Sequence, residues 1–105
     1  MTKINVRFPP SPTGKLHIGN ARTALFNYLF CKHMDGKFVF RIEDTDTERS
    51  KEEFVTNEID AMKWMGINWD EGISIGGDNG PYKQSERLNI YKKHIQKLID
   101  SGHAY

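Results

Sequence analysis

The chain has 105 residues, and its 15 basic and 14 acidic side chains leave a formal net charge of +1. This length suffices for one small domain. The near equality of basic and acidic residues excludes a dedicated basic tail, although a local basic patch would still allow RNA binding. The single cysteine, Cys31, excludes an internal disulfide and fits a reducing cytoplasm, and no apolar run is long enough to span a membrane.

The first 42 residues predict a βαβ unit. The pattern of apolar residues predicts a strand over 3–8, a helix from 20 to about 34, and a second strand over 38–42. Asp35-Gly36 is expected to end the helix, since glycine is the usual residue after a helix carboxyl end. The second strand is almost continuously apolar, which favours burial on both faces within a parallel sheet.

Two further helices are predicted beyond this unit. Residues 50–53 read Ser-Lys-Glu-Glu, a capping box that predicts a helix from there to about residue 65, where Gly66 stops it. Residues 67–70 fit either a short strand or an extended segment, and 71–81, with four glycines, are predicted to be a loop. The last helix is expected over about 85–101. The pattern therefore predicts an α/β domain.

The segment between the first strand and the first helix carries the strongest signal for a ligand site. It lies outside the carboxyl end of a strand, where parallel α/β sheets bind ligands. Prolines hold residues 9–12 extended, and Gly14 is expected to allow a turn that a side chain would block. His17 and Gly19 fall at the helix start, where free N–H groups and the helix dipole favour an anion. The alternative is a rigid proline turn that only caps a helix.

Residues 43–46 hold three carboxylates just after the second strand. Alternation places Glu43 on the same side as Arg41. Because the ends of parallel neighbouring strands meet, residues 7–11 are expected beside them. Acids so close could bind a metal, act as acid and base, or receive an ammonium group; the alternative is a solvated strand end in which an aspartate caps a turn.

Three segments together resemble the signatures of glutamyl-tRNA synthetase, a glutamate-specific class I aminoacyl-tRNA synthetase. They occur in order, and the resemblance covers the whole chain. Asn20 stands where other class I enzymes carry a second histidine, a departure that this family often shows and that removes one imidazole from the ATP phosphates. The matching segments are Arg7 to Gly14 continued by His17-Ile18-Gly19-Asn20 and Ala21-Arg22-Thr23-Ala24-Leu25, then Ile42-Glu43-Asp44-Thr45-Asp46, then Gly80-Pro81-Tyr82 with Gln84-Ser85-Glu86-Arg87.

The resemblance implies a fold and a reaction. Residues 1–105 would form the N-terminal half of a Rossmann-type (HUP-like) parallel-sheet nucleotide-binding domain, a βαβ unit plus two further helices. The full enzyme would join L-glutamate to tRNA(Glu) through a glutamyl-adenylate, using ATP accompanied by Mg²⁺. The second ATP signature of the family and its anticodon-binding domains are not in this sequence, so we expect an incomplete catalytic domain that is weak or inactive alone.

The resemblance also implies roles for individual residues. An arginine fork suits a substrate carboxylate, and a glutamate suits the substrate ammonium group. The residues implied in catalysis are His17 and Gly19. Those implied for glutamate are Arg7, Pro9, Ser11 and Glu43. Those implied for ATP are Pro10, Thr13, Gly14, His17, Gly19 and Asn20. Those implied for the 3′ end of tRNA are Asp46 and Arg49.

Several alternatives remain open at this stage. The chain could belong to the paralogue that glutamylates a queuosine base in tRNA(Asp), or to a non-catalytic nucleotide-binding fragment, although the Ala21–Leu25 helix start fits the true synthetase better. Arg49 could equally be an exposed charge. Trp64 and Trp69 could stack on bases, but core positions are favoured. No histidine has metal-ligand spacing with Cys31, so no zinc is predicted within these residues.

Overall fold

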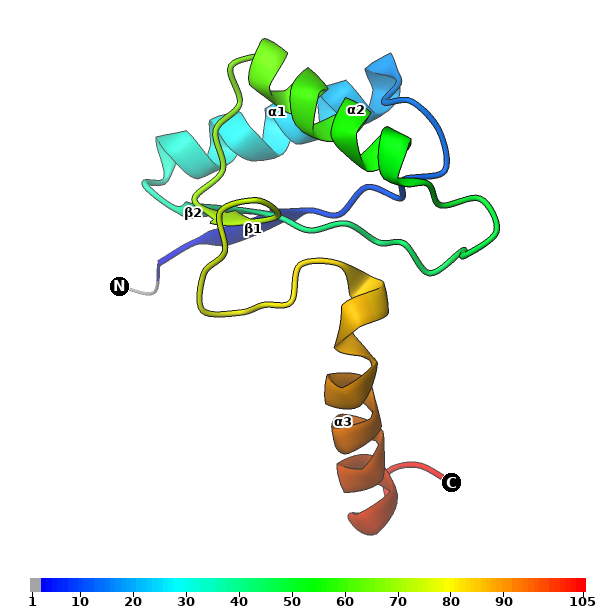
Figure 1. Ribbon diagram of the computed structural model, residues 1–105. Helices are drawn as coiled ribbons and strands as arrows, with labels where there is room; N and C mark the ends of the chain where they lie inside the picture. Colours follow the sequence, from blue (N-terminus) through cyan, green and yellow to red (C-terminus); the bar gives the residue numbers. More distant parts are fainter. Residues whose placement is uncertain (1–2) are drawn as a thin grey trace.

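The computed structural model describes residues 3–105 and has one parallel sheet with the strand order β1-β2-β3. The predicted α/β class is confirmed. Figure 1 shows the elements, which are in chain order β1 (Asn5–Phe8), α1 (Ile18–His33), β2 (Lys37–Phe40), α2 (Glu52–Trp64), β3 (Glu71–Gly72), the 3₁₀ turn η1 (Gln84–Arg87) and α3 (Leu88–Asp100).

The carboxyl ends of β1 and β2 lie side by side, as the βαβ pattern predicted. Phe8 pairs with Phe40 in the parallel register. The pairing continues past the strand ends, because Arg41 N donates to Phe8 O at 3.1 Å and Glu43 N donates to Pro10 O at 2.9 Å. The proline loop and the acidic segment are therefore joined through their backbones.

The core lies between the sheet and the helices α1 and α2, which cover the same face of the sheet (Figure 1). Buried residues alternate along β2, because only every second side chain faces the helices. The prediction that both faces of β2 are buried is wrong for residues 3–105, since Val39 and Arg41 on the other face are only half-buried. The buried apolar core comprises Phe8, Ala24, Cys31, Phe38, Phe40, Ile42, Val55, Met62, Ile67 and Trp69.

In the connection from α1 to β2, the residue with a left-handed backbone conformation is not the predicted glycine. Asp35, with φ +50°, takes the left-handed conformation after the helix. Gly36 is required for a different reason: a Cβ there would lie 2.6 Å from the carbonyl oxygen of Ile4. Glycine therefore lets this turn pack against the start of β1.

The predicted capping box at Ser50 does not form. Helix α2 begins at Glu52, its N-cap is Lys51 without a side-chain cap bond, and Ser50 Oγ is buried with no partner among residues 3–105. The backbone explains the difference, because Lys51 N donates to Pro12 O at 3.1 Å and Ser50 N donates to Asp46 O at 2.8 Å. Lys51 thus holds the proline loop, Ser50 closes a turn with Asp46, and the helix starts at Glu52.

The segment after α2 also departs from expectation. The strand is not formed by 67–70 but by Glu71–Gly72, which were predicted to be in a loop. Trp69 is core as predicted, with its indole N–H donating to Ile73 O at 2.9 Å. Trp64, the last residue of α2, is 88% exposed, so the core prediction is wrong for it.

Helix α3 projects from the body of the molecule (Figure 1). Its lysines at 92, 93 and 97 form the solvated face that was predicted, and Gly102 follows its end with φ +80°. Among the helices of residues 3–105, none combines the length and apolar character that crossing a bilayer requires.

Candidate active site

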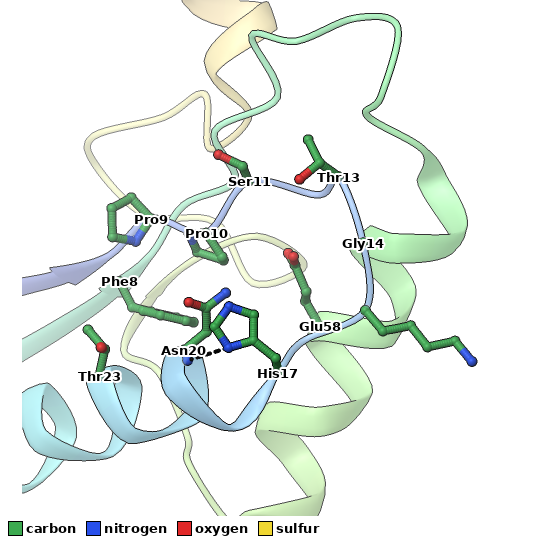
Figure 2. A pocket seen from close by; sticks show the side chains of 11 residues that line it. Phe8, Pro9, Pro10, Ser11, Thr13, Gly14, His17, Asn20, Thr23 and Glu58 are labelled. Atoms are coloured by element: carbon green, nitrogen blue, oxygen red, sulfur yellow. Dashed lines mark hydrogen bonds between the residues drawn. The ribbon is translucent and has the colours of Figure 1, made fainter.

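A cavity of about 420 Å³ lies between the loop that follows β1, the first turn of α1, and α2 (Figure 2). It therefore forms at the carboxyl end of β1, where the sequence predicted a ligand site. Its lining includes seven of the residues implied for glutamate or ATP, namely Pro9, Pro10, Ser11, Thr13, Gly14, His17 and Asn20.

The loop over 9–17 is anchored from two sides. Its carbonyl groups at Pro10 and Pro12 accept the backbone hydrogen bonds described above, and Pro12 is fully buried. From the other side, Leu16 N donates to Asn57 Oδ1 on α2 at 3.0 Å. The loop is thus held in one shape, and the last of these bonds fixes the residue directly before His17.

His17 is the N-cap of α1. Its Nδ1 accepts from the backbone N–H groups of Gly19 at 3.1 Å and Asn20 at 3.4 Å. Because an accepting Nδ1 carries no proton, the neutral ring holds its proton on Nε2, which is left free to donate to a ligand. Two of the amides that the sequence predicted for an anion are therefore already bonded, and the imidazole offers its Nε2–H as a donor in their place.

The two glycines of this segment have different roles from those predicted. A Cβ on Gly19 would lie 3.0 Å from His17 Cε1, so glycine makes room for the capping ring itself. A Cβ on Gly14 would meet no atom of the described residues within 4 Å, and its φ is not left-handed, so the prediction that a side chain would block the turn is wrong. Gly14 instead leaves the cavity wall open.

The cap role of His17 gives a stability prediction. His17→Ala should lower the free energy of unfolding by about 1 kcal/mol, whereas His17→Asn should leave it nearly unchanged, because asparagine is an efficient N-cap. Urea unfolding of the three proteins measures this. Equal losses in both variants would contradict the cap role.

Arg7 does not share the cavity with His17. It alternates with the inward-facing Val6 and Phe8, so it is exposed on the opposite face of the sheet. There it lines a second cavity of about 190 Å³ together with Arg41. A substrate that touched both Arg7 and His17 would have to lie across the end of β1.

Glu43 stands beside this second cavity. Its Oε1 is 3.5 Å from Arg41 Nη2, so the two residues do lie on the same side, as alternation predicted. At this distance the pair is weak, and the glutamate can exchange Arg41 for another cation. His17, Arg7 and Glu43 therefore do not share one pocket: His17 lines the first cavity, whereas Arg7 lines the second, on the opposite face of the sheet, with Glu43 beside it.

Asp46 and Arg49 form an exposed pair. Arg49 Nε lies 2.6 Å from Asp46 Oδ2, and Arg49 N donates to Asp46 Oδ1 at 3.1 Å. The hydrogen bond from the Arg49 side chain lowers the pKa of the Asp46 carboxyl below its ordinary value. The pair closes a turn at the surface, at the end of the acidic segment.

Sequence reasoning missed Glu58, a carboxyl group in the wall of the first cavity (Figure 2). It is 1% exposed, and its Oε2 has no hydrogen-bond partner within residues 3–105. Burial raises the pKa of the Glu58 carboxyl to about 7. The signal was present in the sequence, because Glu58 lies three residues after Val55 and four before Met62, on the apolar face of the helix.

Within residues 3–105, no group of three or more histidine, cysteine, aspartate or glutamate side chains is arranged to hold a metal ion.

A parallel α/β sheet with an anchored loop leading to a capped helix N-terminus defines the class of Rossmann-like nucleotide-binding domains. Residues 3–105 match the family model described as tRNA synthetases class I (E and Q), catalytic domain. The chain therefore belongs to this family.

Individual relatives agree with the family match. A glutamate–tRNA ligase of Carboxydothermus hydrogenoformans is 61% identical over 102 residues, which are 97% of this chain and 21% of that protein. One from a Sulfurihydrogenibium species is 63% identical over 100 residues, 95% of this chain and 21% of its own length. The chain thus spans about a fifth of the length of these relatives.

A solved structure extends the likeness to three dimensions. The crystal structure of a glutamate tRNA ligase from Elizabethkingia meningosepticum in complex with its amino acid superposes with a TM-score of 0.90 at 46% identity. The match covers 94% of this chain and 20% of that one.

Proposed function

We propose that this chain supplies the part of a glutamate–tRNA ligase catalytic domain that binds ATP and begins the glutamate site. The whole enzyme would activate L-glutamate with ATP, releasing pyrophosphate, and pass the glutamyl group to a ribose hydroxyl of tRNA(Glu). The observation that carries the proposal is an identity of about 60% to proteins of that name over nearly the whole chain. These names favour this function over the queuosine paralogue.

In this proposal each of the two cavities binds a different substrate. The first takes ATP, with the Nε2–H of His17 on a phosphate oxygen and the dipole of α1 favouring negative charge. Mg²⁺ would accompany the nucleotide, since it is usually held by phosphates, waters and one or two carboxylates. Catalysis would rest on positioning the glutamate carboxylate in line with the α-phosphorus and on stabilising charge on the phosphate oxygens.

Glutamate would lie on the other side of the end of β1. The guanidinium of Arg7 suits one of its carboxylates, and the carboxylate of Glu43 suits its α-ammonium group. Ser11 is exposed on the loop and lines the first cavity, from where it would face the glutamate. Asp46 and Arg49, next along the surface, are proposed to meet the 3′ end of the tRNA. Aminoacylation belongs where translation occurs, and a cytoplasmic location fits a single, buried cysteine, Cys31.

A chimaera tests the function. The matching 102 residues of the Carboxydothermus ligase would be replaced by this chain, and tRNA(Glu) glutamylation would be measured. We expect activity within about tenfold of the parent, because the exchanged segments share most of their residues. His17→Asn in the chimaera should lower kcat by about 10²–10³, the usual loss for one transition-state donor, without loss of stability. Lys92→Ala on the exposed face of α3 is the matched control. A folded chimaera that glutamylates no tRNA would overturn the proposal.

Arg7→Ala in the same chimaera tests the division of substrates. Loss of a charged hydrogen bond costs about 1.5–3 kcal/mol, so KM for glutamate should rise roughly 10- to 150-fold while KM for ATP changes little. Pyrophosphate exchange at varied glutamate and varied ATP measures both constants. A similar rise in both would count against the assignment of Arg7.

A further inference from the structure

Glu58 is a buried carboxyl group that the proposed chemistry leaves unexplained. It lies in the middle of α2 and is 1% exposed, and Figure 2 shows its side chain rising from that helix toward the space under the loop. Its Oε2 has no partner among the described residues. Buried polar atoms in native proteins are nearly always paired, so an unpaired one beside a ligand cavity calls for a functional reason.

The surroundings offer Glu58 little to offset a negative charge. The charged or titratable groups that line the same cavity are Lys15 and His17, both exposed and both from the loop. The lining residues from β1 and α1, Phe8, Asn20 and Thr23, carry no charge. No ion pair to Glu58 is formed within residues 3–105. Its neighbours one turn away on α2 are all uncharged, namely Phe54, Val55, Ala61 and Met62.

A polyphosphate in this cavity would lie close to the Glu58 carboxylate, and the one lysine or arginine among the residues that line the cavity is the exposed Lys15. For two like charges about 5 Å apart at an effective dielectric constant of about 20, the repulsion is equivalent to a factor of roughly 300 in affinity. The protonated acid has no such repulsion and can donate a hydrogen bond. We propose that the cavity accepts a polyphosphate nucleotide only when Glu58 carries a proton, so that nucleotide binding takes up a proton at this residue. This inference rests on the proposed nucleotide site.

The titration range suits such a linkage. Burial raises the pKa of Glu58 to about 7, so the empty chain holds this proton only up to neutral pH. A bound polyphosphate raises the pKa further, because it disfavours the anion. Nucleotide affinity therefore falls as pH rises above 7, by up to tenfold per pH unit, and is constant well below 7.

Calorimetric titration of the 105-residue chain with ATP in excess Mg²⁺, from pH 6 to 9, tests this. We expect the wild-type dissociation constant to rise 10- to 100-fold between pH 7 and 9, and Glu58→Gln to remove most of that rise. Glu53→Gln, an exposed acid on the same helix, is the matched control and should behave as wild type. Equal slopes for wild type and Glu58→Gln would overturn the inference while leaving the nucleotide site intact. Absence of ATP binding at every pH would instead overturn the nucleotide site.

Proton uptake provides a second measurement that does not depend on the Glu58 variant folding. Binding heats at pH 8 in buffers of different ionisation enthalpy should reveal an uptake of about 0.5 to 1 proton per nucleotide. His17→Asn removes the imidazole, the other group in the cavity that could take up the proton, and the uptake should persist in that variant. Binding without proton uptake in this variant would overturn the inference.

Discussion

Replacing Glu71 by glutamine is expected to lower the free energy of unfolding at pH 7 by about 3 kcal/mol, because it leaves the partner of a buried ion pair without its counter-charge. Glu71 is fully buried in β3, and its carboxylate lies 2.6 Å from Lys37 Nζ on β2. It also accepts from the Tyr82 hydroxyl at 2.8 Å and from Asn79 N at 3.1 Å. The loss is at the lower end for buried pairs, since the Lys37 side chain is 31% exposed.

The matched control for this substitution is Tyr82→Phe. It removes one hydrogen bond to the same carboxylate but keeps the charge pair, so it should cost about 1 kcal/mol. Urea unfolding at pH 7 compares the three proteins. If Glu71→Gln were within 1 kcal/mol of wild type, the ion pair would not hold β3 to the sheet. The network matters for the site because Glu71 lines the second cavity together with Arg7.

The Glu71 carboxylate also makes the stability of the fold depend on pH in the acidic range. The hydrogen bond from Lys37, followed by those from Tyr82 and Asn79, lowers the pKa of Glu71 from 4.5 to about 2. Below pH 4.5 the unfolded chain therefore binds a proton that the folded chain does not, and stability falls as pH drops from 4.5 to 2. Above pH 4.5 the contribution is complete and does not change.

The parts of the fold that could be predicted are those set by local pattern. The βαβ unit follows from the change between periods of two and 3.6, and residues 7–11 meet 43–46 because parallel strands end at one edge. Strand β3 could not be predicted, since two residues carry no periodicity. Its close approach to β2 depends on Gly72, with φ +141°, because a Cβ there would lie 2.1 Å from Phe40 O.

The site was predictable to a similar extent. Prolines and a helix start identified the loop over 9–17, but its anchoring by Glu43, Lys51 and Asn57 depends on the tertiary fold and could not be predicted. The separation of Arg7 from His17 also follows from the sequence, because a residue between the inward-facing Val6 and Phe8 must face the other side of the sheet. The capping of Gly19 N by His17 depends on a side-chain rotamer, which residue order alone does not determine.

Glu58 is expected to give the second large effect on stability. Its dependence on pH has the opposite sign from that of Glu71. Burial raises its pKa from 4.5 to about 7, so between these values the folded chain holds a proton that the unfolded chain has lost. The unfolded state then binds fewer protons, and stability falls as pH rises through this range. Each pH unit is worth about 1.4 kcal/mol, which makes the loss about 3 kcal/mol at pH 7 and above.

Glu58→Gln should therefore match wild type near pH 4.5 and be more stable by about 2–3 kcal/mol at pH 8, because the amide cannot lose a proton. Urea unfolding at pH 4.5, 6, 7 and 8 without nucleotide measures the difference. Glu53→Gln controls for removing an exposed charge from the same helix and should follow the wild-type profile. Parallel profiles for wild type and Glu58→Gln would mean that this carboxyl ionises as freely in the folded chain as in the unfolded one. Since Glu71 acts below pH 4.5 and Glu58 above it, the two glutamates together place their stability maximum near that pH.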